Sequence, residues 1–136
     1  MPMIKVIAGE KGTGKTAQLV EDINAQATTD NNIVCIERSN RLDRLLKYRV
    51  RLVNIEEYPV EGFEQFLSFI CGMCAKDYDV THIYVDSILK VTNETDYDRF
   101  GEFLDKLNTF LGDKITATII CSRAKEVLPE SVTKYC

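Results

Sequence analysis

The chain has 136 residues, of which 45% are hydrophobic and 28% are charged, so it has the size and apolar content of one folded domain over residues 1–136. Its formal net charge of −4 argues against a protein whose whole surface binds nucleic acid. The most apolar stretch, residues 66–75, is too short to span a membrane, and the apolar run within residues 1–9 is too short for a signal peptide. We therefore expect a soluble, cytoplasmic protein.

Short apolar strands alternate with amphipathic helices along the chain. An apolar run over residues 4–8 stops at Gly9, after which Leu19, Val20 and Ile23 fall on one helical face. The same reasoning predicts, in chain order, a strand over 4–8, a helix over 16–27, a strand over 32–37, a short helix ending near Tyr48, a strand over 50–55, a helix over 63–76, a strand over 82–87, a helix over 95–111 opened by the cap Thr95, a strand over 115–122 and a short tail over 124–136.

This alternation predicts an α/β fold, a three-layer sandwich around a mostly parallel central sheet, because strands buried on both faces are apolar throughout. Ligands of such sheets bind beyond the carboxyl ends of the strands. Gly9, Glu37, Asp86 and Ser122 all stand at strand carboxyl ends in this interpretation. We expect these four residues to converge on one edge of the sheet.

The stretch GEKGTGKT, residues 9–16, matches the pattern G-x-x-x-x-G-K-[ST] and lies between a predicted strand and a predicted helix. Glycines let successive backbone N–H groups face inward as an anion-binding nest, to which the following helix adds its positive end. Phosphate is the expected ligand, with the lysine on the β and γ phosphates and the threonine hydroxyl on Mg²⁺. The expected nucleotide-binding residues are Gly9, Glu10, Lys11, Gly12, Thr13, Gly14, Lys15, Thr16 and Ala17.

Asp86 ends the apolar run IYVD and is a second candidate site residue. A carboxylate at this point can accept a hydrogen bond from a metal-bound water or from the threonine hydroxyl of a phosphate-binding loop. We expect Asp86 and Thr16 to lie on the metal side of the site. A plain turn or helix cap is the alternative interpretation of Asp86.

Residues 38–51 form a basic segment, with six basic residues and one acidic residue. Leu42, Leu45 and Leu46 fall at helical spacing, which predicts a solvated helix with arginines between the leucines. A basic rim beside a nucleotide or another polyanion is the alternative, so nucleic acid remains a less favoured partner.

The five cysteines do not form a disulfide framework, and we expect them to be reduced. Cys71 and Cys74 form a CxxC, but it lies inside a predicted helix, and His82 is the only histidine. Two further zinc ligands are not evident, so we interpret both sulfurs as small apolar packing groups.

The loop and Asp86 resemble the motifs of P-loop NTPases. The chain has neither the base-reading NKxD of GTPases, nor the signature lysine of the deviant P-loop ATPases, whose position is Glu10, nor a segment long enough for the lid of small kinases. The sequences GTGKT, VDS at 85–87 before a helix, and CIERSNRLD are similar to segments of the RecA-like core shared by RecA, KaiC and RadA. Small proteins of Gram-positive bacteria labelled ATP-binding or PilT-like have a comparable layout. The resemblance covers residues 3–123.

The resemblance implies a role for residues beyond the loop. RecA-like proteins place a catalytic glutamate at the end of the second strand, where this chain has Glu37, and many ATPases place one directly after the metal-side aspartate, where it has Ser87. Glu37 as a strand-end carboxylate paired with an arginine is an equal alternative. Ser122 corresponds to a polar residue that senses the γ-phosphate. Arg38, Arg41 and Arg123 are the arginines available to the transition state, and no sequence feature separates them.

From these features we expect an ATP-binding protein with ATP and Mg²⁺ as cofactors that is a slow Mg-dependent ATP hydrolase of RecA-like type, with Lys15 and Glu37 as its catalytic residues. A nucleotide-sensing or interaction module without hydrolysis is the first alternative, and a small nucleotide or small-molecule kinase is the second. Because RecA relatives build sites between subunits, the resemblance also implies a homo-oligomer or a larger protein partner.

Overall fold

Five parallel strands form the central sheet of the computed structural model, which describes residues 3–136. Across the sheet their order is β1 (Ile4–Ala8), β5 (Thr116–Cys121), β4 (His82–Asp86), β2 (Ile33–Glu37) and β3 (Arg51–Asn54). Every neighbouring pair is parallel, so all five carboxyl ends lie at the same edge. The predicted α/β class and parallel sheet are confirmed, and the strand positions agree with the sequence interpretation to within a residue.

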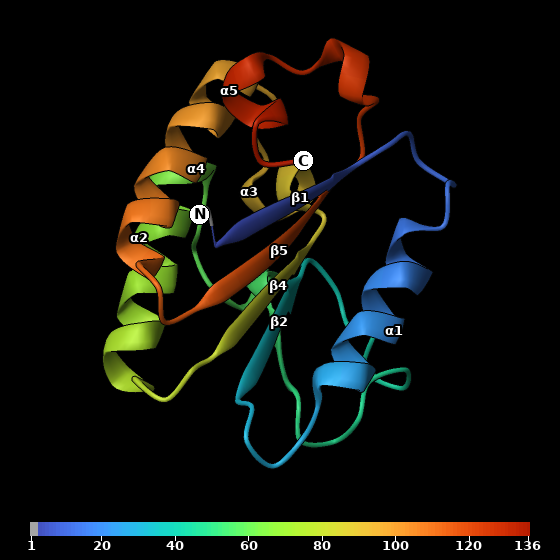
Figure 1. The fold of residues 1–136 in the computed structure, drawn as a ribbon, viewed down its shortest axis with the longest axis vertical. Coiled ribbons are helices and arrows are strands. Elements are labelled where there is room, and N and C mark those ends of the chain that lie inside the picture. The colour runs from blue at the N-terminus through green and yellow to red at the C-terminus, as the bar shows by residue number, and fades with distance from the viewer. Residues whose placement is uncertain (1–2) are drawn as a thin grey trace.

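Helices cover both faces of the sheet, which produces three layers (Figure 1). Helix α1 (Lys15–Gln26) packs on one face, where Leu19 and Ile23 meet Ile33 and Cys35 of β2. The other face is covered by α2 (Gly62–Lys76), α3 (Ile88–Thr92), α4 (Tyr97–Leu111) and α5 (Glu130–Thr133). Two short 3-10 turns, η1 (Ile55–Glu57) and η2 (Lys125–Val127), complete the regular structure. All five residues of β2 are buried, as expected of a central strand between two layers.

The basic segment does not form the helix that the leucine spacing predicts. Residues 38–50 follow a series of turns, in which Leu42 is buried while Leu45 is 55% exposed. The buried carboxylate of Glu37 accepts a hydrogen bond from the backbone N–H of Leu42, and the Ser39 hydroxyl accepts one from the backbone N–H of Arg41. Side-chain bonds of this kind compete with the helical backbone pattern, which explains the difference.

Helix α4 begins two residues later than predicted, and its cap is Asp96 rather than Thr95. The Asp96 carboxylate accepts hydrogen bonds from the backbone N–H groups of Asp98 and Arg99. Both residue types are good caps, so sequence alone could not separate two adjacent candidates. The helix α3 was not predicted by periodicity, because five residues are too few to display a helical pattern.

The C-terminal tail is an integral part of the fold. Helix α5 packs on α4, and the backbone N–H of Val6 in β1 donates to the carbonyl of Tyr135 at 2.9 Å. The edge strand β1 is therefore covered by the tail. No helix within residues 3–136 is long and apolar enough to cross a lipid bilayer.

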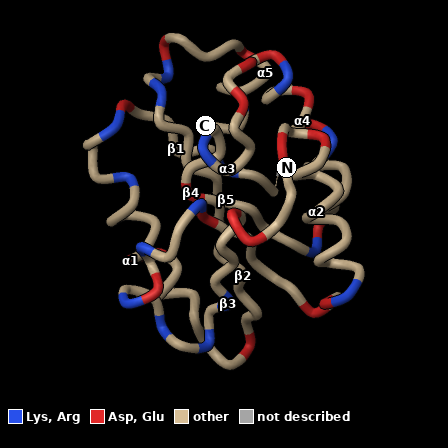
Figure 2. Tube along the Cα trace, turned by 180° about the vertical axis from the view of Figure 1, so that it is seen from behind, with Lys and Arg blue, Asp and Glu red and all other residues tan. Residues whose placement is uncertain are grey.

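Basic and acidic residues are interspersed along the trace in both helical layers (Figure 2). The six basic residues of the segment 38–51 come from turns and from the start of β3, not from one helix face. Any selection of an anionic ligand must therefore come from a local arrangement of charges.

Candidate functional site

The glycine-rich loop, residues 9–14, turns the chain from β1 into α1. Gly12 and Gly14 have φ angles of 87° and 83°, a left-handed backbone that glycine adopts without a steric penalty. Gly14 is also the N-cap of α1, and no side chain caps this helix. The N–H groups of the first helical turn therefore remain available to a ligand at the positive end of α1.

Lys15 lies over this loop and is almost completely buried. Its ammonium donates to the carbonyl of Glu10 at 2.6 Å and to the hydroxyl of Thr13 at 3.1 Å. The Thr13 hydroxyl in turn donates to the same Glu10 carbonyl at 2.9 Å. An ammonium group carries three N–H donors, so one donor of Lys15 is not used by these contacts.

A long-range hydrogen bond joins the start of α1 to the end of β4. The Thr16 hydroxyl donates to the Asp86 carboxylate at 3.0 Å, across 70 residues of sequence, although β5 separates β1 from β4 in the sheet. Both groups are hard oxygen ligands, which suit Mg²⁺, an ion that usually takes one or two protein ligands and keeps several waters. Next to them, the hydroxyls of Ser87 and Ser122 approach to 3.3 Å, and the peptide bond between Asp86 and Ser87 is cis.

These groups line a cleft with a volume of about 200 Å³ at the carboxyl edge of the sheet. Four cationic side chains and one carboxylate face it, namely Lys11, Lys15, Arg41, Lys90 and Asp86. The remaining lining residues are Gly12, Gly14, Thr16, Ala17, Ser87 and Ser122. An excess of positive charge beside a helix N-terminus favours an anionic ligand.

Most of the residues expected from the sequence meet in this cleft, but Gly9, Glu10 and Thr13 do not line it. The carbonyl of Glu10 and the hydroxyl of Thr13 instead accept hydrogen bonds from the ammonium of Lys15, which does line the cleft. Lys90 was missed, since it belongs to no motif and is an exposed lysine in the short helix α3. Only the topology, which places the start of α3 directly after β4, brings it to the site.

Glu37 lies at the expected edge of the sheet, in register with Asp86, but it is not among the residues that line the cleft. It is fully buried, and its two carboxylate oxygens are both used. One accepts from the Ser39 hydroxyl at 2.9 Å and the other from the backbone N–H of Leu42 at 3.0 Å. Its hydrogen-bond partners are thus in the turns of the basic segment and include no arginine.

The three arginines that the sequence left equivalent have different surroundings. Arg38 donates to the carbonyls of Lys90 and Val91 at the end of α3. Arg123 donates to the Tyr97 hydroxyl and to the Ser122 carbonyl, each at 2.9 Å. Only Arg41 of the three lines the cleft.

The cysteines are free thiols. Cys74 of α2 is buried in the core as the sequence suggested, whereas Cys71 of the same helix is only half-buried. Burial raises the pKa of the Cys71 and Cys74 thiols. Burial also raises the pKa of Cys35 far above its usual range, and the nearby carboxylates of Glu37 and Asp86 raise it further. Within the described part of the chain, no group of three or more His, Cys, Asp or Glu side chains is placed to hold a metal ion.

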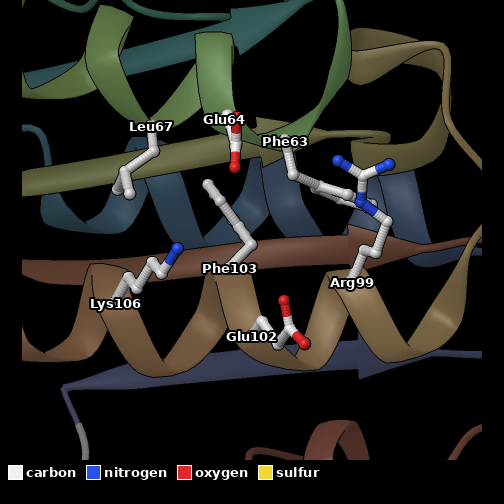
Figure 3. Close-up of a pocket in the computed structure, with 7 residues that line it drawn as sticks. All are labelled: Phe63, Glu64, Leu67, Arg99, Glu102, Phe103 and Lys106. Carbon is white, nitrogen blue, oxygen red and sulfur yellow. The ribbon is translucent and has the colours of Figure 1, made fainter.

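Other hollows lack the charge pattern of the cleft. A cavity of about 50 Å³ lies between α2 and α4, and Figure 3 shows the residues around it, which are Phe63, Glu64, Leu67, Arg99, Glu102, Phe103 and Lys106. Its two acidic and two basic side chains balance in formal charge. A larger groove of about 460 Å³ between β3 and α2 is lined by apolar groups such as Val53, Phe69 and Met73.

Comparison of the chain with models of known protein families and with curated proteins finds no match.

Proposed function

We propose that the cleft binds Mg-ATP and that the protein is a P-loop NTPase with a RecA-like core. The observation that carries the proposal is the meeting, in one cationic cleft, of the glycine-rich loop, Lys15 and the Thr16–Asp86 pair. A glycine-rich turn formed for packing alone would not require a buried lysine above it or a carboxylate from β4 beside the helix N-terminus.

The backbone of residues 12–17 and the start of α1 would hold the inner phosphates. Lys15 would exchange its bonds with the Glu10 carbonyl and the Thr13 hydroxyl for bonds to the β and γ phosphates. This exchange replaces two neutral acceptors by charged ones, and hydrogen bonds to charged groups are the stronger kind.

The donor set at Thr16 and Asp86 fits Mg²⁺, with the threonine hydroxyl as a direct ligand and the carboxylate behind it. When bound, the ion would offset the charge of the phosphates and polarise the phosphoryl oxygens. Asp86 would then hold the threonine hydroxyl or a metal-bound water in place. By resemblance to RecA relatives, the proposal extends to a homo-oligomer or a larger protein partner that completes the site.

Nucleotide-dependent stabilisation tests the proposal. At a ligand concentration about 100 times the Kd, binding stabilises the folded state by roughly 2.7 kcal/mol. With an unfolding entropy of about 2.1 cal/mol/K per residue, a chain of 136 residues should melt roughly 9 °C higher with Mg-ATP.

Lys15→Ala should abolish most of this increase, whereas Lys114→Ala, an exposed lysine before β5 at the opposite edge of the sheet, should preserve it. An equal increase in the wild type and in Lys15→Ala would refute binding at the glycine-rich loop.

Hydrolysis is a separate question, and two observations favour a second candidate function, a nucleotide sensor without turnover. Ser87 stands where a water-polarising glutamate follows the aspartate in many ATPases, and both oxygens of Glu37 are already hydrogen-bonded. Among the described residues, Asp86 is the one carboxylate that lines the cleft, and Glu37 is fully buried outside that lining, so any hydrolysis should be slow.

Phosphate release from Mg-ATP separates the two candidates. In hydrolysis, water adds to the γ phosphorus, the bond to the bridging oxygen breaks, and ADP and phosphate leave. We expect slow release that increases per subunit with protein concentration if neighbouring subunits complete the site. Saturable binding without release would identify a sensor.

A further inference from the structure

Two cations of the cleft, Arg41 and Lys90, belong to neither the glycine-rich loop nor the Thr16–Asp86 pair. They come from separate parts of the chain, Arg41 from the turns after β2 and Lys90 from α3 after β4. Both side chains are exposed, whereas Lys15 is buried. The cleft therefore has a second group of positive charges besides the one supplied by the loop.

The backbone around Arg41 is anchored to the sheet. Glu37, the last residue of β2, is fully buried and accepts from the Ser39 hydroxyl and from the backbone N–H of Leu42. The Ser39 hydroxyl, which gives its own hydrogen to Glu37, accepts from both the backbone N–H and the side-chain Nε of Arg41, each at 3.3 Å. The side chain of Leu42 is 2% exposed and fixes the next residue in the core.

Arg38 connects the turn that carries Arg41 to α3 through hydrogen bonds. Its guanidinium donates to the carbonyl oxygens of Lys90 and Val91, the latter at 3.3 Å. The backbones that carry Arg41 and Lys90 are therefore joined to each other, and both side chains face one cleft.

The guanidinium of Arg41 donates to Ser39 through Nε. Its two terminal nitrogens have no protein partner among the described residues. Those nitrogens carry the pair of N–H groups that grips phosphate oxygens in a bidentate manner. In the proposed complex, the loop amides hold the inner phosphates and Lys15 reaches the β and γ phosphates, which leaves further γ-phosphate oxygens for other donors. Arg41 and Lys90 would contact the γ phosphate, which a nucleoside triphosphate has and a diphosphate lacks.

We propose that Arg41 and Lys90 form a terminal-phosphate subsite that makes the cleft prefer nucleoside triphosphates to diphosphates, with Glu37 and Ser39 as the positioning residues of Arg41. This inference rests on the proposed nucleotide binding and deepens it. It assigns Glu37 to the recognition of the γ-phosphate through Arg41 and not to the activation of water.

Isothermal titration with Mg-ADP and with the non-hydrolysable analogue Mg-AMP-PNP tests the subsite. Wild type should bind Mg-AMP-PNP roughly tenfold or more tightly than Mg-ADP, on the scale of one charge-assisted contact. Arg41→Ala and Lys90→Ala should each weaken binding of Mg-AMP-PNP severalfold more than binding of Mg-ADP, and thereby reduce this preference. Arg44→Ala, an exposed arginine of the same segment that does not line the cleft, is the matched control and should keep the wild-type preference.

Failure of the inference is distinct from failure of the proposed function. If wild type binds neither nucleotide, both are overturned. If wild type binds both nucleotides and Arg41→Ala keeps the same preference, the subsite is overturned while nucleotide binding stands.

Ser39→Ala and Glu37→Gln test the positioning role, with melting curves to show that each variant is folded. Both variants should lose preference for Mg-AMP-PNP over Mg-ADP, because a glutamine offers one acceptor oxygen for two donors and alanine offers none to Arg41. Since Glu37 is buried, Ser39→Ala decides the matter if Glu37→Gln does not fold. An unchanged preference in Ser39→Ala, or a loss of turnover alone in a folded Glu37→Gln, would overturn the positioning role.

Discussion

Gly101 in α4 lies directly against Ser131 of the C-terminal tail, so Gly101→Ala should destabilise the fold. A methyl group there would overlap the hydroxyl oxygen of Ser131 in α5 and would lie 2.6 Å from the Cβ of Ser131, closer than real Cβ atoms come. The backbone carbon of Ser131 is only 3.4 Å away, so α5 must shift. Gly72 in α2 is the matched control, because a Cβ at that exposed position would meet no atom within 4 Å.

The two substitutions share one favourable effect and differ in one unfavourable effect. Alanine is roughly 1 kcal/mol better than glycine in a helix interior, so Gly72→Ala should stabilise by about that amount. Overpacking typically costs about 1–3 kcal/mol, so Gly101→Ala should be destabilising by roughly 1 kcal/mol net. For 136 residues this corresponds to melting about 3–4 °C lower for Gly101→Ala and about 3–4 °C higher for Gly72→Ala.

Urea unfolding of both variants, of Ser131→Gly and of the double variant Gly101→Ala with Ser131→Gly measures these effects. The double variant removes the atoms that overlap, so it should show a favourable coupling of roughly 2 kcal/mol, equal to the overpacking cost, relative to the two single variants. If Gly101→Ala stabilises as much as Gly72→Ala does, the close packing of the tail on α4 is refuted.

Three further predictions concern the site and the sheet. Asp86→Asn should weaken the dependence of ATP affinity on Mg²⁺ while the fold is retained, and a titration with magnesium that matches wild type would refute its link through Thr16. Burial lowers the pKa of His82 below its ordinary value of 6.5, although Asp22 opposes this; stability should thus fall as pH drops below about 6.5, where the unfolded chain takes up a proton first. The urea midpoint of the wild type should be lower at pH 5.5 than at pH 7.5. In the same buffers, the difference between the two midpoints should be smaller for His82→Gln. Tyr84→Phe removes a 2.7 Å bond to the exposed Asp22 and should cost about 1 kcal/mol with an unchanged urea slope, so a midpoint equal to that of wild type would contradict the contact.

The sequence was informative about the sheet because its strands are buried on both faces. In β2, Val34 and Ile36 enter one core while Ile33 and Cys35 enter the other, which produces an apolar run with no alternation. The basic segment misled because its leucine spacing is helical, whereas the buried carboxylate of Glu37 binds its backbone. A contact from a strand to the following turn leaves no periodic signal in the sequence.

The candidate site divides in the same way. The glycine-rich loop has a local pattern, since its backbone angles and Lys15 depend on neighbours in sequence. The sequence could not show which arginine lines the cleft. Arg38, for example, is held by hydrogen bonds to carbonyl groups 52 and 53 residues away in sequence, and residue type does not predict such contacts. The surroundings of Glu37 likewise became evident only once its two hydrogen-bond partners were located.

Backbone amide NMR during a titration with Mg-ADP is the most direct test of the central claim, because it reports both binding and position. The account predicts saturable shifts concentrated in residues 9–17, with smaller shifts at Asp86, Ser87 and Ser122, and none around the cavity between α2 and α4. Lys15→Ala should remove those shifts at the same nucleotide concentration. An unchanged spectrum of the wild type, or shifts centred on α2 and α4, would contradict nucleotide binding at the carboxyl edge of the sheet.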